Sequence, residues 1–424
     1  MVLLIIATFI IGYIAIALEH TIKINKAASA LITGVICWTF YIVFTEDKNI
    51  VDNNLLHHLG EQSQILFFLL GAMTIVELID AHDGFEIITK RITTKNKKKL
   101  LWIIGLLAFL LSAVLDNLTT SIVMISLVRK LMVDKKNRLM FAGAIVISAN
   151  AGGAWSPIGD VTTTMLWIGG QITASNIIVK LILPSLVCMT IPLTVMQYFL
   201  KGEVQKPSEK FEDAETPNER HRNIVFFTGI TIFLLVPVFK TVTHLPPFMG
   251  ILLGLGILWI IVEILHSDKD EADRKHYTVA YALRKIDSSS ILFFLGILLA
   301  IGALESTGQL LRMAQAMNKV IGNENLIVII IGLASSVVDN VPLVAAAMGM
   351  YSLQQYPADH YFWEFLAYCT GTGGSILIIG SAAGVAIMGI EKMDFIWYLK
   401  RISWLALIGY FAGACIYILQ EQML

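Results

Sequence analysis

Charged residues are scarce in this chain. Only 15% of its 424 residues are Asp, Glu, Lys or Arg, whereas 56% are hydrophobic; an ordinary soluble domain carries about 25% charged residues. The mean hydropathy is +0.72, so membrane lipid is the expected surrounding. Positive charge is not in excess either, because 31 Lys and Arg are balanced by 32 Asp and Glu. Nucleic acid is therefore not an expected partner.

Cysteine is also sparse. Its four positions, Cys37, Cys188, Cys369 and Cys415, all fall in apolar stretches and have no metal-ligand spacing among them. We expect them to be small packing residues, and we expect no resident metal or cofactor.

Long apolar runs are abundant. A membrane helix needs about 20 mostly apolar residues, and the first such run lacks the charged start and cleavage site of a signal peptide. We predict an all-α polytopic membrane protein with about ten full spans plus two hairpins. The predicted spans are 2–18, 27–45, 64–81, 141–170, 177–200, 223–243, 247–266, 288–305, 361–390 and 402–419.

The two predicted hairpins are the apolar segments 100–128 and 325–353, each with an Asp-Asn pair near its middle. Lys and Arg cluster on both flanks of 100–128, so both flanks are predicted to be cytoplasmic. A segment that begins and ends on one side must turn back, which predicts a re-entrant hairpin. The segment 325–353 has few flanking cations and is predicted to enter from outside.

The two halves of the chain repeat one another. The run Ile-Leu-Phe-Phe-Leu at 65–69 recurs at 291–295, and each half continues with Ser-x-x-x-Asp-Asn and a glycine-interrupted span. Copies that enter from opposite faces are inverted repeats, a design of many secondary transporters. The predicted organisation is 1–60, N-terminal spans; 61–200, first inverted repeat; 201–222, cytoplasmic linker; 223–287, connecting spans and loop; 288–424, second inverted repeat with the C-terminal span.

The spans 141–170 and 361–390 are predicted to be broken helices. Gly152, Gly153, Pro157 and Gly159 interrupt the first, because proline removes a backbone donor and glycine weakens a helix. The second carries Thr-Gly-Thr-Gly-Gly-Ser at 370–375. Broken helices expose carbonyl groups and helix ends that can ligate a small cation.

Three carboxylates, Asp116, Asp160 and Asp339, lie at membrane depth, where each costs about 2.5 to 3.5 kcal/mol or more. Hydroxyls and helix N-termini could satisfy them, but we favour a cation or proton site. Sodium prefers the oxygen ligands found here, and neither hairpin interior nor either broken span contains Lys or Arg. Burial disfavours a charged carboxylate and sodium favours it, so one group can hold either a proton or a metal ion.

Glu77, Asp80 and Glu305 lie toward the ends of the spans that precede the hairpins. An interfacial position explains them equally well. Glu77 is the best candidate of the three for proton handling, and Glu305 is a second.

The stretches SANAGGAWSPIGDVTTTMLW (148–167) and SSVVDNVPLVAAAMGMY (335–351) resemble the motifs of NhaD-type sodium/proton antiporters, a branch of the ion transporter superfamily. The resemblance implies sodium ligands at Asp116, Asn150, Asp160, Asp339 and Asn340. The wider ion- and proton-binding set that it implies adds Asn117, where some relatives carry a second acid, and Thr162, Thr163, Ser335 and Ser375.

The resemblance also implies exchange of Na⁺ or Li⁺ for H⁺ and a homodimer with a moving transport domain. We expect a place in the bacterial inner membrane, because no transit peptide precedes the first span. An anion or arsenite carrier of the same superfamily is the alternative. An intramembrane protease would need a catalytic constellation around its acids, and no usual protease motif surrounds these, so we do not expect an enzyme.

Overall fold

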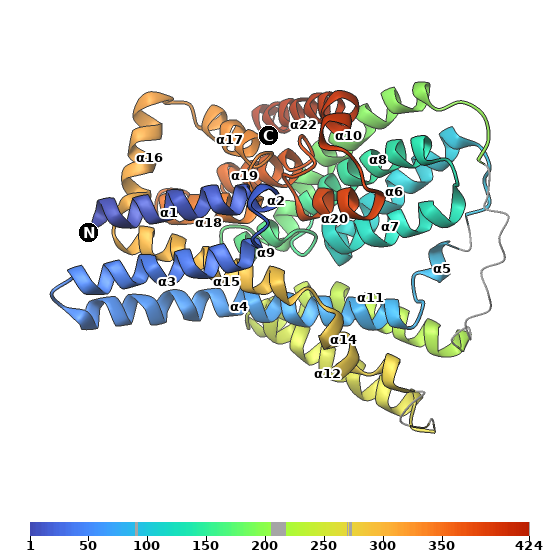
Figure 1. The fold of residues 1–424 in the computed structure, drawn as a ribbon, viewed down its shortest axis with the longest axis horizontal. Helices are drawn as coiled ribbons and strands as arrows, with labels where there is room; N and C mark the ends of the chain where they lie inside the picture. The colour runs from blue at the N-terminus through green and yellow to red at the C-terminus, as the bar shows by residue number, and fades with distance from the viewer. Residues whose placement is uncertain (90–91, 205–217, 269, 271–273, 424) are drawn as a thin grey trace.

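The computed structural model describes residues 1–89, 92–204, 218–268, 270 and 274–423 (Figure 1). All regular elements in this part of the chain are helices, which confirms an all-α polytopic membrane protein. Most of the predicted linker 201–222 lies outside the described residues; its last residues already belong to α11 (Glu219–Thr243).

One helical group is formed by α1 (Val2–Ala17), α3 (Lys26–Phe44), α4 (Lys48–Ala81) and α15 (Ser288–Ser306). Helix α3 packs between α1 and α15, and α15 also contacts α4. Helices α3 and α15 approach one another so closely that a Cβ at Gly296 would lie 2.4 Å from the Leu31 backbone nitrogen. The N-terminal spans and the start of the second repeat therefore form one packed layer.

Helix α4 is longer than predicted. It begins at Lys48, where the Asp47 side chain accepts a hydrogen bond from the Asn49 N–H, whereas the apolar run begins only near residue 64. The predicted boundary at residue 60 therefore lies inside a continuous helix. Helices α11, α12 (Pro247–Leu265) and α14 (Val279–Lys285) pack on α4.

The first repeat contains a hairpin and a broken helix. The hairpin arms are α6 (Lys97–Leu115) and α7 (Asn117–Leu131), separated by Asp116 alone. The broken helix is α8 (Lys135–Ala154) followed by α9 (Val161–Ile168), and α10 (Ala174–Phe199) comes next. The predicted break in 141–170 is thus confirmed.

The second repeat follows the same order. The hairpin arms are α17 (Glu324–Ala334) and α18 (Asn340–Met350), and the broken helix is α19 (Tyr361–Gly373) with α20 (Ala382–Glu391). Helix α16 (Gln309–Val320) leads into α17 at a bend of 119°. In Figure 1 the two hairpins approach the centre from opposite ends of the molecule. Helix α22 (Trp404–Met423) packs on α10. The short elements are α2 (Glu19–Ile22), α5 (Glu86–Thr89), η1 (Lys275–Tyr277), α21 (Phe395–Tyr398) and η2 (Leu399–Ser403).

Glycines allow the backbone of each broken helix to approach its hairpin closely. A Cβ at Gly152 would lie 2.2 Å from the Phe109 carbonyl oxygen, and a Cβ at Gly373 would lie 2.1 Å from the Gly332 carbonyl oxygen. No side chain fits at either distance. The two repeats therefore use the same backbone contact at equivalent positions.

Eight helices in the described residues are long and apolar enough to cross a membrane, or nine if the bent pair α16 and α17 is one span. The predicted number of about ten full spans is not confirmed. The difference arises partly because α1 has only 16 residues and because the broken spans consist of shorter helices.

Candidate functional site

Asp160 lies at the break between α8 and α9 and is only 2% exposed. It caps α9, since its Oδ1 accepts hydrogen bonds from the Thr162 backbone N–H at 2.9 Å and from the Thr162 hydroxyl at 2.8 Å. The Thr163 hydroxyl completes the cap by accepting from the Asp160 N–H at 3.3 Å. The helix break therefore fixes a buried carboxylate at the end of a helix.

Both hairpin tips reach this carboxylate. The Asn117 amide, at the start of α7, donates to Asp160 Oδ2 at 2.5 Å. The Asn340 amide, at the start of α18, donates to both Asp160 oxygens at 3.3 Å. Equivalent asparagines from the two repeats thus meet at one acid.

Asn150, in the last turns of α8, links the same cluster to the second broken helix. Its Oδ1 accepts from the Asn117 amide at 3.1 Å, and its own amide donates to the hydroxyls of Ser375 at 2.9 Å and Ser381 at 3.0 Å. We call Asn117, Asn150, Asp160, Thr162, Asn340, Ser375 and Ser381 the polar cluster. All seven residues are buried.

Asp116 lies beside the polar cluster in a strained backbone conformation. Its φ of 98° and ψ of 160° fall in a region populated almost only by glycine, where another residue costs about 1–3 kcal/mol. The carboxylate accepts from the Thr119 N–H at 2.7 Å and from the Thr119 hydroxyl at 2.9 Å. These bonds hold the turn, and among the described residues Asp116 makes no ion pair.

Asp339, the equivalent residue of the second hairpin, has different partners. Its Oδ2 accepts from Lys26 Nζ at 3.1 Å, and its Oδ1 accepts from the Val341 N–H at 3.3 Å. The sequence shows no cation in either hairpin, but the fold brings one from α3. The absence of Lys and Arg from the hairpin sequences therefore does not leave Asp339 without a basic partner.

Ser335 also lies outside the polar cluster. Its hydroxyl donates to the carbonyls of Gly332 at 2.8 Å and Thr370 at 3.0 Å. Ser112 does the same in the first repeat, donating to the Ala149 carbonyl at 2.6 Å. These serines join each hairpin to its broken helix, and their hydroxyl protons already have acceptors.

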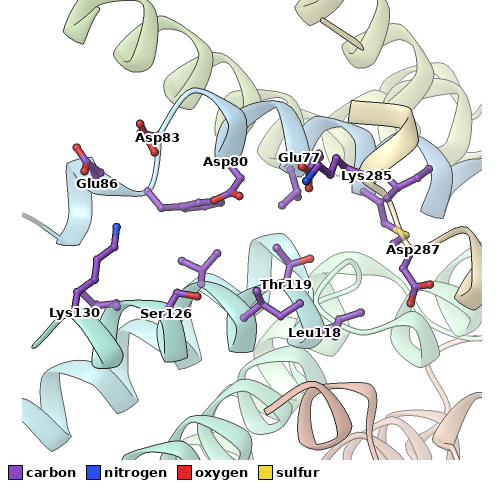
Figure 2. Close-up of a pocket in the computed structure, with 17 residues that line it drawn as sticks. Glu77, Asp80, Asp83, Glu86, Leu118, Thr119, Ser126, Lys130, Lys285 and Asp287 are labelled. Carbon is purple, nitrogen blue, oxygen red and sulfur yellow. The ribbon is translucent and has the colours of Figure 1, made fainter. Parts of the chain in front are cut away.

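Figure 2 shows a cavity of about 260 Å³ between α4 and α7. Glu77 and Asp80 of α4 face Thr119 and Ser126 of α7 across it, and Lys130 and Lys285 also line it. Thr119 is the residue that holds Asp116. Glu77, the predicted proton-handling residue, therefore lines the same cavity as Thr119, which is hydrogen-bonded to Asp116 at the first hairpin tip.

Glu305 lines a second cavity, of about 320 Å³, with Glu61, His58 and Met348. The two cavities lie along the continuous helix α4, at Gln62 and at Glu77, which are about 22 Å apart at 1.5 Å per residue. Glu77 and Glu305 thus lie in separate cavities, and neither belongs to the polar cluster.

The polar cluster offers one carboxylate, amide oxygens and hydroxyls, which are the ligand types of a hard cation. It contains no basic side chain. Of the five residues expected to ligate sodium, Asn150, Asp160 and Asn340 lie in this network. Asp116 and Asp339 cap their own helices next to Asn117 and Asn340.

Ser381 and Lys26 were not predicted from the sequence. Ser381 had a signal, because it follows Gly380 as Asp160 follows Gly159 in the equivalent broken helix. Lys26 had none, since it lies 313 residues from Asp339 and in another helical group.

Sequence comparisons with known proteins identify the family of this chain. A family model described as a citrate transporter (CitMHS) matches residues 2–371. Sodium/proton antiporter 2 of Arabidopsis thaliana is 46% identical over 417 residues, 97% of each chain, and sodium/proton antiporter 1 of that plant is 47% identical over 97% of this chain and 71% of its own. The Na(+)/H(+) antiporter NhaD of Alkalimonas amylolytica is 30% identical over 97% of this chain and 89% of its own. This multi-pass membrane protein therefore belongs to the citrate transporter family and, within it, to the NhaD-type transporters.

Proposed function

We propose that the protein is a secondary antiporter that exchanges Na⁺ or Li⁺ for H⁺. The observation that carries the proposal is the single buried carboxylate of Asp160, which receives the amides of both hairpin tips. Relatives named as sodium/proton antiporters, which align over nearly the whole chain, support it.

The exchange follows from competition at Asp160. In the conformation described here, neutral donors satisfy the carboxylate. A sodium or lithium ion would replace the Asn117 and Asn340 amide N–H groups, and a rotated amide presents its oxygen as a ligand instead. A proton on Asp160 removes the charge that holds the metal ion, so the two occupants exclude one another.

Net exchange requires that the loaded site opens to each side of the membrane in turn. The cavities at Glu77 and Glu305 are the proposed aqueous approaches, because they lie at different levels of α4. Alternating access of this kind fits inverted repeats whose binding site lies between them.

An anion carrier is the second candidate, and the citrate transporter description of the matched family favours it. An anion such as citrate requires positive charge or many free donors at its site. The polar cluster instead has a negative charge, and the donors of Asn117, Asn150 and Asn340 already have acceptors. Cation exchange therefore fits the site better.

A homodimer in the bacterial inner membrane is part of the proposal, and lipid would surround its apolar surface. The resemblance to NhaD-type antiporters supports the homodimer. The relatives at 30% identity are bacterial and agree with the location, whereas the relatives at 46–47% identity are from a plant.

Flux in reconstituted vesicles tests the proposed function. We expect sodium and lithium gradients to drive proton movement in the opposite direction at a clamped membrane potential, with no response to N-methylglucamine. Uptake of citrate or arsenite without sodium-dependent proton movement would contradict cation exchange and support the anion carrier.

A further inference from the structure

The two hairpin aspartates are equivalent in the repeat but unequal in charge environment. Asp116 is held by the Thr119 N–H and hydroxyl, whereas Asp339 forms an ion pair with Lys26 at 3.1 Å. The side chains of Lys26 and Asp339 are 26% and 16% exposed. The pair is thus largely withdrawn from water, which strengthens the attraction between its charges.

Each member of this pair is fixed to the end of a rigid element. Lys26 is the first residue of α3, which the Asn25 side chain caps and which packs between α1 and α15. Asp339 is the cap of α18 in the second hairpin. The Lys26 Nζ also lies 4.3 Å from the centre of the Phe293 ring of α15, a cation–π contact. The Lys26 ammonium group is therefore positioned by α3 and α15, and it forms its ion pair with the second hairpin.

The space around the pair is suited to a small cation. A cavity of about 80 Å³ is lined by Tyr13, Glu19, Lys26 and Asp339. The Tyr13 hydroxyl is buried and has no hydrogen-bond partner among the described residues. Once the ammonium leaves, the Asp339 and Glu19 carboxylates and the unpaired Tyr13 hydroxyl oxygen line the cavity, and all are ligand types for a hard cation.

We propose that Lys26 is a tethered cation that competes with the transported cation for Asp339. A metal ion and an ammonium group weaken one another's binding to one carboxylate, because their like charges repel. Cation loading at Asp339 therefore favours opening of the contact between α3 and the second hairpin. This inference rests on the proposed function, since it concerns which cation occupies a site of that transporter.

Sodium binding measured without turnover tests the proposal. We would measure the sodium concentration that gives half-maximal thermal stabilisation of the detergent-solubilised protein at fixed pH. In Lys26→Gln this concentration is expected to fall roughly three- to tenfold, because a partly exposed ion pair no longer competes. Lys26→Arg keeps the charge and should behave as the wild type.

Lys180→Gln is the matched control, because Lys180 forms an ion pair with Glu421 at 2.5 Å with similar exposures of 22% and 23%. It should leave the sodium dependence unchanged. An unchanged or weakened sodium response in Lys26→Gln would overturn the proposal and leave the pair as a structural contact.

If Lys26→Gln does not fold, a measurement on the wild type tests whether sodium displaces Lys26 from Asp339. Labelling by an amine-reactive reagent, followed by mass spectrometry, should increase at Lys26 when sodium replaces N-methylglucamine, and should not change at Lys180. Equal labelling of Lys26 in both salts would overturn the proposal. If the vesicles show no sodium-driven proton movement but Lys26 responds to sodium as expected, sodium/proton exchange fails as the function, whereas competition between Lys26 and sodium for Asp339 stands.

Discussion

Asp160 and Ser381 begin their helices with nearly the same backbone angles, φ −144° and ψ 150° for Asp160 and φ −143° and ψ 152° for Ser381. Each side chain caps its own helix, at the Thr162 N–H and the Gly384 N–H. The same backbone position thus carries a charge in the first repeat and a neutral hydroxyl in the second. At these two positions of the polar cluster the repeats share the same backbone conformation but differ in side-chain charge.

The first prediction concerns that charge. Asp160→Asn should keep the fold, because an asparagine can still cap α9, but should lower sodium-driven proton movement about 100-fold or more, since the charge that we propose to bind the cation is lost. Flux in vesicles measures this effect. Asp134→Asn is the control, because Asp134 caps the exposed start of α8 and its loss of charge should not matter. Wild-type rates in folded Asp160→Asn would remove Asp160 from the site.

The second prediction concerns the link between the two broken helices. Asn150→Ala should raise the sodium concentration for half-maximal exchange about five- to tenfold, since hydrogen bonds worth about 1 kcal/mol each are lost. Ser381→Ala should have a smaller effect. In the double variant the effects should be less than additive, because Asn150 and Ser381 share a hydrogen bond. Full additivity would show that this bond does not contribute to ion binding.

The third prediction concerns the cavity between α4 and α7. Glu77→Gln removes a negative charge from its wall and should raise the half-maximal sodium concentration about twofold at low ionic strength, with the effect shrinking as choline chloride is added. Glu263→Gln, an exposed acid on α12 outside both cavities, is the control. A Glu77→Gln effect that is independent of salt would instead point to a direct part in proton transfer.

The fourth prediction concerns stability. Gly152→Ala should lower the melting temperature and destabilise the protein by about 1–3 kcal/mol, because its methyl group would overlap the Phe109 carbonyl. Gly60→Ala is the control, since a Cβ there meets nothing within 4 Å and helical alanine is favoured by about 0.5–1 kcal/mol. Equal melting temperatures for the two variants would contradict the close contact.

The helix breaks and hairpin turns could be predicted because their signals are local. Glycine and proline in 152–159, and polar pairs at 116–117 and 339–340, mark backbone that cannot continue as a buried apolar helix. They led to Asp160, whereas the resemblance to NhaD-type antiporters implied Asn117, Asn150 and Asn340. The start of α4 was missed because residues 48–63 are polar yet helical, and hydropathy does not detect such a segment.

The ion pair between Lys26 and Asp339 could not be predicted, because it depends on the packing of α3 against a hairpin 313 residues away. The sequences of the segments that form a site therefore do not predict which basic side chains lie near it. A lysine at the end of a distant span has a side chain long enough to reach several ångströms into a neighbouring element.

The unequal walls of the two cavities have a practical consequence. The cavity between α4 and α7 is lined by seven charged residues: Glu77, Asp80, Asp83, Glu86, Lys130, Lys285 and Asp287. The charged residues of the second cavity are Glu61 and Glu305. If each cavity is the proposed approach from one compartment, sodium arriving from the two sides meets different local fields. Vesicles holding the protein in mixed orientations should therefore give two superimposed saturation curves, and a single-sided preparation should give only one of them.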